Sequence, residues 1–270
     1  MGLIVGVPLA GTLIFLYGWQ SAFTVTAAIG VILGIIWIIV YKPKEIETHR
    51  GVRLSTVKWT DLLRNRSVIG MSIGFFSANY VNWIFITWLP DYLYKSHHLS
   101  ILKSGFASGI IFTGGIVGVF LGGWLSDYLV KKGFSRTIVR KSFIVAGLVL
   151  TIPMIATVGL HSAFWTIAIL VWSDFMYSVA ASNYWTIMVD ISGSDTIGSI
   201  SSIQNGIGNF AGIVAPIITG VIISATNSFY LAFLVGTGFL IISCLSYVFI
   251  VGPAKHLKVP ELKSDHTLQL

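Results

Sequence analysis

Charged residues are scarce in this chain. Only 10% of its 270 residues are Asp, Glu, Lys or Arg, whereas 55% are hydrophobic and the mean hydropathy is +0.85. In a soluble domain of similar size, about 25% of the residues are charged. Because the shortage runs along nearly the whole sequence, a larger buried core does not account for it. The composition excludes an ordinary soluble domain and predicts an integral membrane protein.

Cysteine and reactive motifs are also scarce. Cys244 is the single cysteine, which excludes an internal disulfide, and no Cys or His pair has the flanking ligands that a zinc site requires. The chain has no Ser/His/Asp set, no Gly-rich phosphate loop and no HExxH motif. We therefore expect no bound metal, no cofactor and no enzymatic activity.

Long apolar runs dominate what is present. A helix needs about 20 mainly apolar residues to cross the hydrocarbon core of a bilayer. Eight runs approach or reach this length, and the first of them is short: 2–17, 20–41, 68–94, 104–127, 142–160, 163–190, 197–225 and 228–251. These runs predict an all-α integral membrane protein with about eight transmembrane helices.

The 17 Lys and Arg residues gather between these runs. Most of them lie in the segment 42–66, in the loop that follows Asp127, or in the tail after residue 252. Eight spans place these three regions on one side of the membrane, and only Lys95 and Lys103 fall on the other. Loops rich in basic residues stay in the cytoplasm. The net charge of +7 therefore reflects topology and predicts a cytoplasmic C-terminus, not a nucleic-acid partner.

Glycines recur at four-residue spacing in the run 104–127. Gly114, Gly118 and Gly122 form a stripe of small residues, which lets another helix backbone approach closely. The stripe is compatible with static packing and equally with two helices that rock against each other in a transporter.

Polar residues recur on one face of the run 197–225. Asn205 and Asn209 lie one turn apart on that face, while the opposite face is rich in Ile. Amides in a membrane helix are costly unless they face protein, water or a solute. Hydrogen bonding between helices would satisfy them, but we favour a solute cavity. In the run 68–94, Asn79 and Trp83 are deep enough to line the same cavity, whereas Trp88, Tyr92 and Tyr94 fit an aromatic belt at the outer boundary.

Asp174 is the acidic residue that lies well inside a predicted span. Ser178, Ser182 and Trp185 share its face of the helix 163–190. An ionisable group at this depth is expensive and marks a functional site by default. Asp174 is therefore our candidate for cation coupling: it would take up a proton, bind a cation, or pair with a basic residue of another helix. A neutral, hydrogen-bonded structural Asp is the alternative.

Several segments resemble known transporters. The segment "GGWLSDYLVKKGFSRTIVRK" (122–141) resembles the conserved loop motif of the major facilitator superfamily, in the copy between the second and third helices of the C-terminal half. Four further segments resemble the anion:cation symporter family: "YGWQSAF" (17–23), "KWTDLLRNRSVIG" (58–70), "TWLPDYL" (87–93) and "NGIGNFAGIVAPIITGVI" (205–222). Members of that family move organic anions such as sugar acids, usually with protons or sodium.

The resemblance covers essentially the whole chain and implies a domain plan. The eight runs correspond to the fifth to twelfth helices of a major-facilitator-type helical bundle, so the chain is expected to be N-terminally incomplete. Residues 1–41 would be the last two helices of the N-terminal bundle and 42–66 a basic cytoplasmic central loop. Residues 67–252 would form the C-terminal six-helix bundle, and 253–270 a cytoplasmic tail. The four preceding helices would then be a further partner.

The resemblance also implies site residues. By matching position, the substrate pocket would be lined by Asn79, Trp83, Ser182, Trp185 and Asn205. Asn209 joins this set from periodicity alone. Asp127, the acid of the loop motif, would pair with Arg140 or with a neighbouring helix N-terminus and form a conformational gate. Asp174 matches no family position, so its coupling role depends only on its predicted burial.

Together these features predict a secondary active transporter that works by alternating access. Its partners would be membrane lipid, a small organic anion, such as a hexuronate or an aldonate, and a coupling proton or sodium ion. The cell membrane would be its location. Two alternatives stay open: the same fold with another substrate class, such as neutral sugars or drugs for efflux, or a non-transporting scaffold, sensor or fragment.

Overall fold

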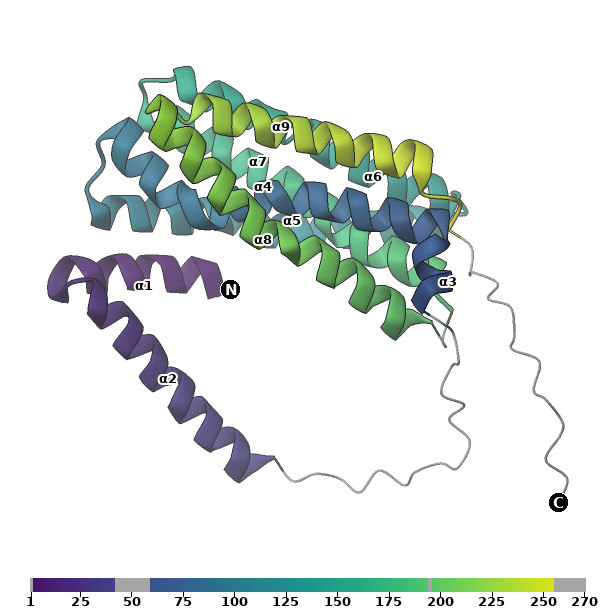
Figure 1. The fold of residues 1–270 in the computed structure, drawn as a ribbon, viewed down its shortest axis with the longest axis horizontal. Coiled ribbons are helices and arrows are strands. Elements are labelled where there is room, and N and C mark those ends of the chain that lie inside the picture. The colour runs from purple at the N-terminus through teal and green to yellow at the C-terminus, as the bar shows by residue number, and fades with distance from the viewer. Residues whose placement is uncertain (1, 42–58, 194–195, 255–270) are drawn as a thin grey trace, which may run out of the picture.

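The computed structural model describes residues 2–41, 59–193 and 196–254, and every regular element in these ranges is helical (Figure 1). In chain order the elements are α1 (Gly2–Tyr17), α2 (Trp19–Val40), α3 (Trp59–Arg64), α4 (Arg66–His97), α5 (Ile101–Lys131), α6 (Arg136–Val149), the 3₁₀ helix η1 (Ile152–Gly159), α7 (Ala163–Ile191), α8 (Ile197–Thr226), α9 (Tyr230–Leu245) and the π-helical turn η2 (Ser246–Ile250).

Within the described ranges, seven helical segments are long and apolar enough to cross a membrane. They include two composite spans, in which α6 continues into η1 and α9 into η2. The predicted run 2–17 is also a helix, but its 16 residues are shorter than a full span. The apolar runs thus correspond to the observed helices within a few residues, and the chain is a multi-pass membrane protein.

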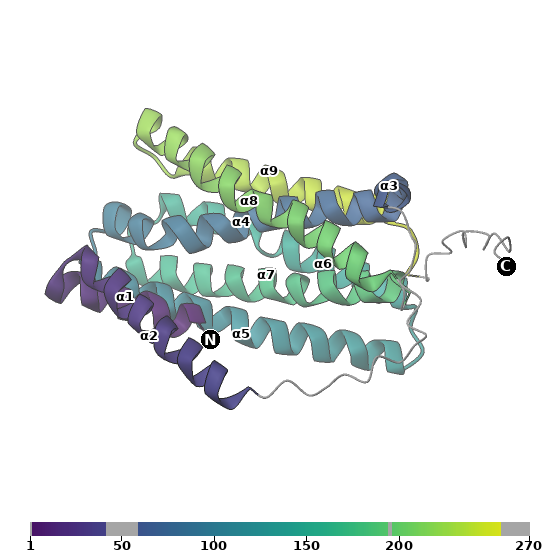
Figure 2. The ribbon, with the colours of Figure 1, turned by 60° about the horizontal axis from the view of Figure 1, so that its bottom comes forward.

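Helices α4 to α9 form a bundle in which α4 is central. Helix α4 packs against α5, α7, α8 and α9, while α7 also packs against α5 and α6 (Figure 2). Among the largest fully buried side chains are four tyrosines on α4, α7 and η2: Tyr80, Tyr92, Tyr184 and Tyr247. Tyr92 packs against Phe229 and Phe233, with ring centroids 5.1 Å apart in each pair. Tyr92 is therefore a core residue, and the aromatic-belt prediction is wrong for it.

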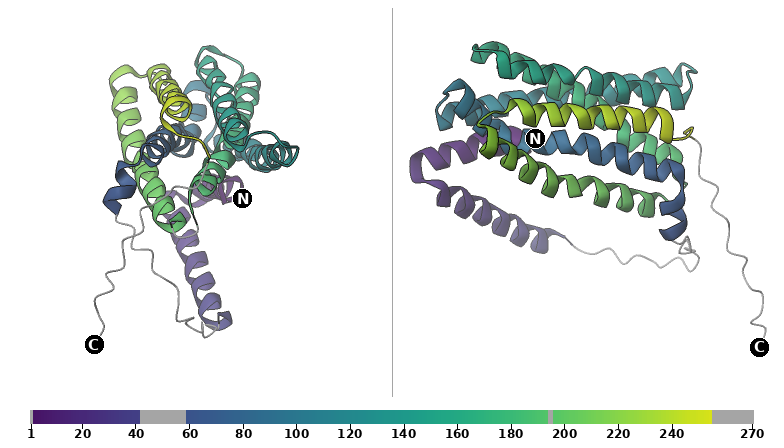
Figure 3. Two further views of the ribbon diagram at one scale, coloured as in Figure 1. Left: turned by 90° about the vertical axis from the view of Figure 1, so that its right-hand side faces the viewer. Right: turned by 45° about the horizontal axis from the view of Figure 1, so that its top comes forward.

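Helices α1 and α2 lie outside this bundle. Helix α1 runs along α5, whereas α2 diverges from the other helices (Figure 3), and none of its residues is buried. This arrangement is compatible with the predicted division at residue 41, which stays a proposal. Most basic residues of the segment 42–66 and of the tail, including Lys58 and Lys255, lie outside the described residues.

Side-chain caps and one glycine turn fix the ends of the helices near the charged loop. The Asn65 side chain caps α4 by accepting hydrogen bonds from the backbone N–H groups of Ser67 at 2.9 Å and Val68 at 3.4 Å. Gly133, with φ of 97°, makes the turn between α5 and α6, a conformation that suits a residue without a Cβ. This turn brings the start of α6 back beside the end of α5.

Basic side chains at the same end hold the last helix. Lys141 donates to the backbone carbonyl of Val251, and Arg66 donates to that of Phe249. Cations at a helix C-terminus satisfy its free carbonyl groups and interact favourably with the helix dipole. Lys141 thus attaches α6, and Arg66 attaches α4, to the chain at the end of η2.

Candidate functional site

The glycine stripe of α5 sets the position of α7. A Cβ built at Gly114 would lie 2.5 Å from the carbonyl oxygen of Val171, and one at Gly122 would lie 2.7 Å from Cα of Val179. Gly118 meets the backbone of Phe175 in the same way. The two backbones are thus in direct contact, which places the polar residues of α7 at a defined height beside α5.

Aromatic rings of α4 pack directly against glycines of α8. The Phe75 ring lies against Gly208, and a Cβ built at Gly212 would lie 2.7 Å from Cε2 of Trp83. The indole N–H of Trp83 is buried and has no hydrogen-bond partner among the described residues. Trp83 therefore presents an unused donor at the interface between α4 and α8.

The predicted pocket residues on α8 are both exposed. Asn209 Nδ2 donates to the side-chain oxygen of Asn205 at 2.7 Å and to its backbone oxygen at 2.9 Å. The two amides thus form a pair on the surface of α8. Asn79, one turn before Trp83 on α4, is instead buried.

The predicted pocket residues on α7 have different surroundings. Trp185 is 40% exposed, and its ring centroid lies 5.5 Å from that of Phe75. Ser182 Oγ donates to the backbone of Val179 at 2.9 Å and accepts from Asn183 Nδ2 at 3.2 Å. Ser182 is thus engaged within its own helix in this conformation.

The structure therefore links part of the predicted set through aromatic contacts. Phe75 joins Trp185 to α4, and Gly212 joins Trp83 to α8. Among the described residues no hydrogen bond connects Asn205 or Asn209 with the predicted residues of α4 and α7. Phe75 is not among the predicted pocket residues. Its contacts with Gly208 and Trp185 join three helices, and no local pattern in the sequence indicates them.

Asp174 lines a separate cavity of about 590 Å³. The residues around this cavity come from α1, α4, α5 and α7: Gly2, Leu3, Ile4, Asn82, Phe112, Gly115, Ile116, Val119, Phe120, Asp174 and Ser178. Asp174 is 6% exposed and Ser178 is 8% exposed. Ser182 and Trp185, predicted on the same face of α7, do not line this cavity, whereas Asn82 of α4 does.

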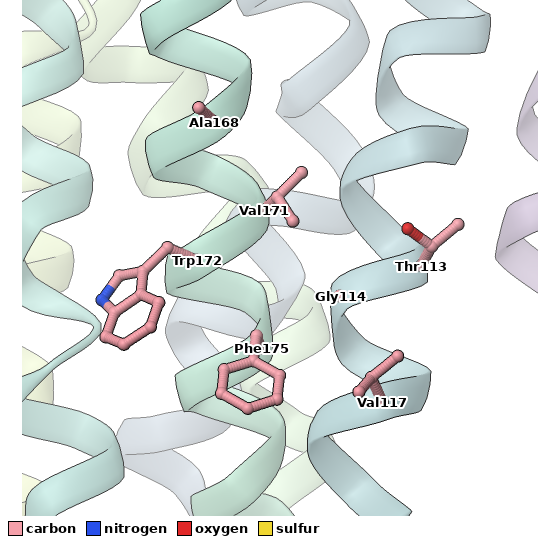
Figure 4. Close-up of a pocket in the computed structure, with 7 residues that line it drawn as sticks. All are labelled: Thr113, Gly114, Val117, Ala168, Val171, Trp172 and Phe175. Carbon is pink, nitrogen blue, oxygen red and sulfur yellow. The ribbon is translucent and has the colours of Figure 1, made fainter.

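A second hollow of about 440 Å³ lies between α5 and α7 (Figure 4). Its lining is mostly apolar, and the hydroxyl of Thr113 and the indole N–H of Trp172 are the polar groups of its side chains. Thr113, Val117 and Trp172 are exposed.

A buried arginine organises the charged end of α5, α6 and α7. The Arg140 guanidinium lies 2.6 Å from Oδ1 of Asp127 through Nη2 and 3.3 Å from Oδ2 of Asp190 through Nε. Its Nη1 donates to Ser126 Oγ at 2.6 Å. Arg136 adds a longer ion pair to Asp190, at 3.8 Å. The planar guanidinium with its fixed donors suits such a shared position.

The pairing of Asp127 with Arg140 is present, while their role as a gate stays a prediction. Asp127 is largely exposed, with 57% of its side-chain surface accessible, whereas Arg140 is buried and Asp190 is nearly so. Asp190 and Ser126 are absent from the predicted set. Asp190 ends the run 163–190 on the same side of the membrane as the basic loop, and that position is the signal that would have found it.

Several named proteins are similar in sequence to this chain over nearly its whole length. It is 32% identical to the probable galactarate/D-glucarate transporter GudP of Bacillus subtilis (strain 168), over 96% of this chain and 62% of that protein. It is 29% identical to a probable L-galactonate transporter of Escherichia coli (strain K12), over 93% and 59%. A hexuronate transporter of Bacillus subtilis (strain 168) is 27% identical, over 91% and 61%. The chain spans about three-fifths of the length of these relatives.

The fold is also found in solved structures. A bacterial homolog of the human lysosomal transporter Spinster, in an inward-facing and unoccupied conformation, superimposes with a TM-score of 0.67 at 15% identity. The match covers 91% of this chain and 64% of that one. The family model described as Major Facilitator Superfamily matches residues 1–216. With its all-helical membrane fold and its transporter relatives, which are not enzymes, the chain belongs to the Major Facilitator Superfamily.

Proposed function

We propose that this chain belongs to a secondary active transporter that takes up a sugar acid by alternating access. The observation that supports this most directly is the shared substrate class in the names of its relatives, which are galactarate or glucarate, galactonate and hexuronate transporters. Each aligns with more than nine-tenths of this chain. Uptake would be driven by a proton or sodium gradient across the cell membrane.

The chemistry of the predicted pocket suits a polyhydroxylated solute. Asn79, Asn205 and Asn209 supply amide donors and acceptors, and Ser182 supplies a hydroxyl. The rings of Trp83 and Trp185 would cover the apolar faces of the sugar chain. None of these residues is a cation, so the carboxylate of the substrate would be met by residues outside this set.

The cluster around Arg140 would act as the conformational gate. It connects the ends of α5, α6 and α7 through one buried guanidinium. Removing one partner of a buried ion pair costs about 3–5 kcal/mol, a magnitude that applies to Arg140 with Asp190, whereas solvent screens the pair with the largely exposed Asp127. A conformational change that breaks this cluster would therefore raise the free energy of one conformer relative to the other.

The orientation follows from the basic residues at this end of the bundle. Lys131, Lys132, Arg136 and Lys141 lie on or between α5 and α6, and Arg66 begins α4. Since Lys and Arg are retained in the cytoplasm, we place this end and the C-terminus on the cytoplasmic side.

The test is uptake of labelled galactarate by cells that express the protein, compared with cells carrying the empty vector. We expect saturable uptake that unlabelled D-glucarate and galacturonate inhibit and that neutral galactose leaves unchanged. Inhibition by galactose instead would favour a neutral-sugar transporter. Absence of uptake for all sugar acids, with the protein present in the membrane, would refute the proposal.

Two substitutions connect the activity to the structure. Asn205→Ala should raise the Km for the sugar acid without loss of expression, and an unchanged Km would remove Asn205 from the pocket. Asp127→Asn should shift the ratio of inward-accessible to outward-accessible protein in cysteine labelling. Asp61→Asn on the short helix α3 is its matched control, and equal accessibility in both variants would contradict the gate.

A further inference from the structure

Asp174 is a buried carboxylate that forms no ion pair with the basic residues that the structure describes. The ion pairs among the described residues involve Asp91, Asp127 and Asp190, and none reaches Asp174. Asp174 lies near the middle of α7 and is 6% exposed. Because an acid at this depth is expensive, those that occur are paired or take part in ion or proton movement. Since no ion pair of the described residues includes Asp174, a role in ion or proton movement is the use that fits it.

The backbone of α5 leaves room for this carboxylate. A Cβ built at Gly115 would lie 2.5 Å from Asp174 Oδ2 and 3.0 Å from Ser178 Oγ. Gly115 therefore lets the carboxyl and the hydroxyl lie side by side against a neighbouring helix. The cavity of about 590 Å³ in front of them exceeds the roughly 30 Å³ that one water molecule occupies in the liquid. The cavity thus has room for water beside the carboxylate.

The first turn of α1 forms one wall of the same cavity. Gly2, Leu3 and Ile4 line it, next to residues of α4, α5 and α7. Farther along α1, a Cβ at Gly109 of α5 would meet the Pro8 ring at 2.6 Å, so the two helices are in close contact just beyond the cavity. The carboxylate therefore lies where the first turn of α1 meets the bundle of α4 to α9, a contact that we call the seam.

The lining favours a proton over a metal cation as the occupant. Asp174, Ser178 and Asn82 are its polar side chains, while the others are apolar or glycine. Hard cations take several oxygen ligands, commonly six or more for Ca²⁺ and Mg²⁺, whereas a proton needs a single carboxylate oxygen. No charged side chain lines the cavity from α1, α4 or α5. Tyr177, three residues along α7 and buried, is the neighbouring titratable group.

We propose that Asp174 binds the coupling proton at this seam, and that its protonation controls how closely α1 packs on α5. An ionised carboxylate retains water in the cavity and holds α1 away, whereas the neutral acid allows the apolar wall to close. The proposal extends the proposed function, because it specifies which ion drives sugar-acid uptake and where that ion binds. One step, proton binding to Asp174, then links the ion gradient to the contact between the helices.

The first experiment measures the cavity directly and needs no substrate. In a Cys244→Ser background, Val119→Cys reports access to the cavity, and Ile138→Cys on the exposed face of α6 reports the intrinsic pH dependence of labelling. We expect the ratio of maleimide labelling rates, Val119→Cys over Ile138→Cys, to rise several-fold from acidic to neutral pH. With Asp174→Asn added, the ratio should stay flat. An equal rise in both backgrounds would overturn the proposal.

A second variant keeps the test decisive if Asp174→Asn does not fold. Gly115→Ala retains the carboxylate but forces it away from α5. We expect the pH midpoint of the labelling ratio to move relative to the parent protein, while Gly123→Ala, whose Cβ would meet nothing closer than 4.0 Å, should leave it in place. An unmoved midpoint in Gly115→Ala would contradict a site at Asp174.

Transport then separates this inference from the proposed function. In vesicles with an imposed pH gradient, Asp174→Asn should lose accumulation of galactarate above the outside concentration but retain exchange of labelled for unlabelled galactarate. Asp91→Asn, at the far end of α4, should retain both. Accumulation driven by sodium at constant pH would overturn the proton assignment. If the parent protein moves no sugar acid at all, the proposed function fails, whereas the labelling result stands by itself.

Discussion

Two helix interfaces in this bundle both depend on glycine, but the glycines meet different partners. Between α5 and α7, Gly114, Gly118 and Gly122 meet the backbone of the opposite helix. Between α4 and α8, glycines meet side-chain rings instead, such as that of Trp83 at Gly212. Backbone atoms of a packed helix have no room to move, whereas an aromatic ring rotates about its side-chain bonds.

The difference predicts that the interface of α5 and α7 tolerates added volume less than the interface of α4 and α8. The glycine stripe keeps the backbones of α5 and α7 in contact beside Asp174, whereas the Arg140 cluster lies beyond the stripe, at the end of these helices. The interface of α4 and α8 carries predicted pocket residues on side chains that adjust. Small residues at membrane helix contacts serve close packing in both cases. Alanine substitution of individual glycines tests whether the two interfaces differ in this way.

Gly118→Ala should have the largest effect. Its Cβ would collide with the carbonyl group of Phe175, and the helix backbone there cannot yield without moving α7. Overpacking typically costs about 1–3 kcal/mol, and we expect the upper end of this range because no side chain can rotate away. The measurement is thermal unfolding of the purified protein in detergent. A melting temperature equal to that of the parent protein would show that this interface also adjusts.

Gly212→Ala should have a smaller effect on stability but a clear effect on binding. The new methyl group would lie 2.7 Å from the Trp83 ring, which must move, and Trp83 is itself a predicted pocket residue. We expect sugar-acid affinity to fall about tenfold, equivalent to about 1.4 kcal/mol, with the fold retained. Substrate-dependent thermal stabilisation measures this. A loss of folding with no native protein recovered would place Gly212 with the rigid glycines.

Much of the fold could be predicted from the sequence because the bilayer imposes a simple rule. Each long apolar run must be a helix, since no other open structure satisfies its backbone in lipid. The expected runs 104–127 and 163–190 therefore correspond to α5 and α7. Tyr92 was placed wrongly because its position near a helix end does not show which neighbour covers it. Phe229 and Phe233, far along the chain, bury it.

The sites were harder to predict because they depend on contacts between helices. Helical periodicity places Ser178 and Ser182 on one face with Asp174, but it does not show that Asp174 and Ser178 meet Gly115 of α5 while Ser182 meets Gly122. Only Ser178 shares the cavity with the acid. Likewise Arg140 has a second acidic partner, Asp190, that lies 50 positions away; the end of the run 163–190 indicates its side of the membrane but not its pairing with Arg140.

Gly238→Ala in α9 should slightly stabilise the protein. A Cβ there would meet no atom within 4 Å, so the substitution adds no contact and removes none. Glycine inside a helix is less favourable than alanine by about 0.5–1 kcal/mol, and this amount should be gained. Thermal unfolding under the same conditions measures the change. Destabilisation would mean that the open surface at Gly238 is filled by lipid or by another part of the assembled protein.

Gly220→Ala should have the smallest effect, because two contributions oppose each other. Its Cβ would lie 3.3 Å from Cζ2 of Trp88, so the ring must move by a few tenths of an ångström. The helix-forming preference of alanine offsets that cost, and we expect a net change within about 0.5 kcal/mol. A loss comparable to that of Gly118→Ala would show that Trp88 cannot move. The interface of α4 and α8 would then be as rigid as that of α5 and α7, and adjustment for the substrate would have to come from elsewhere in the protein.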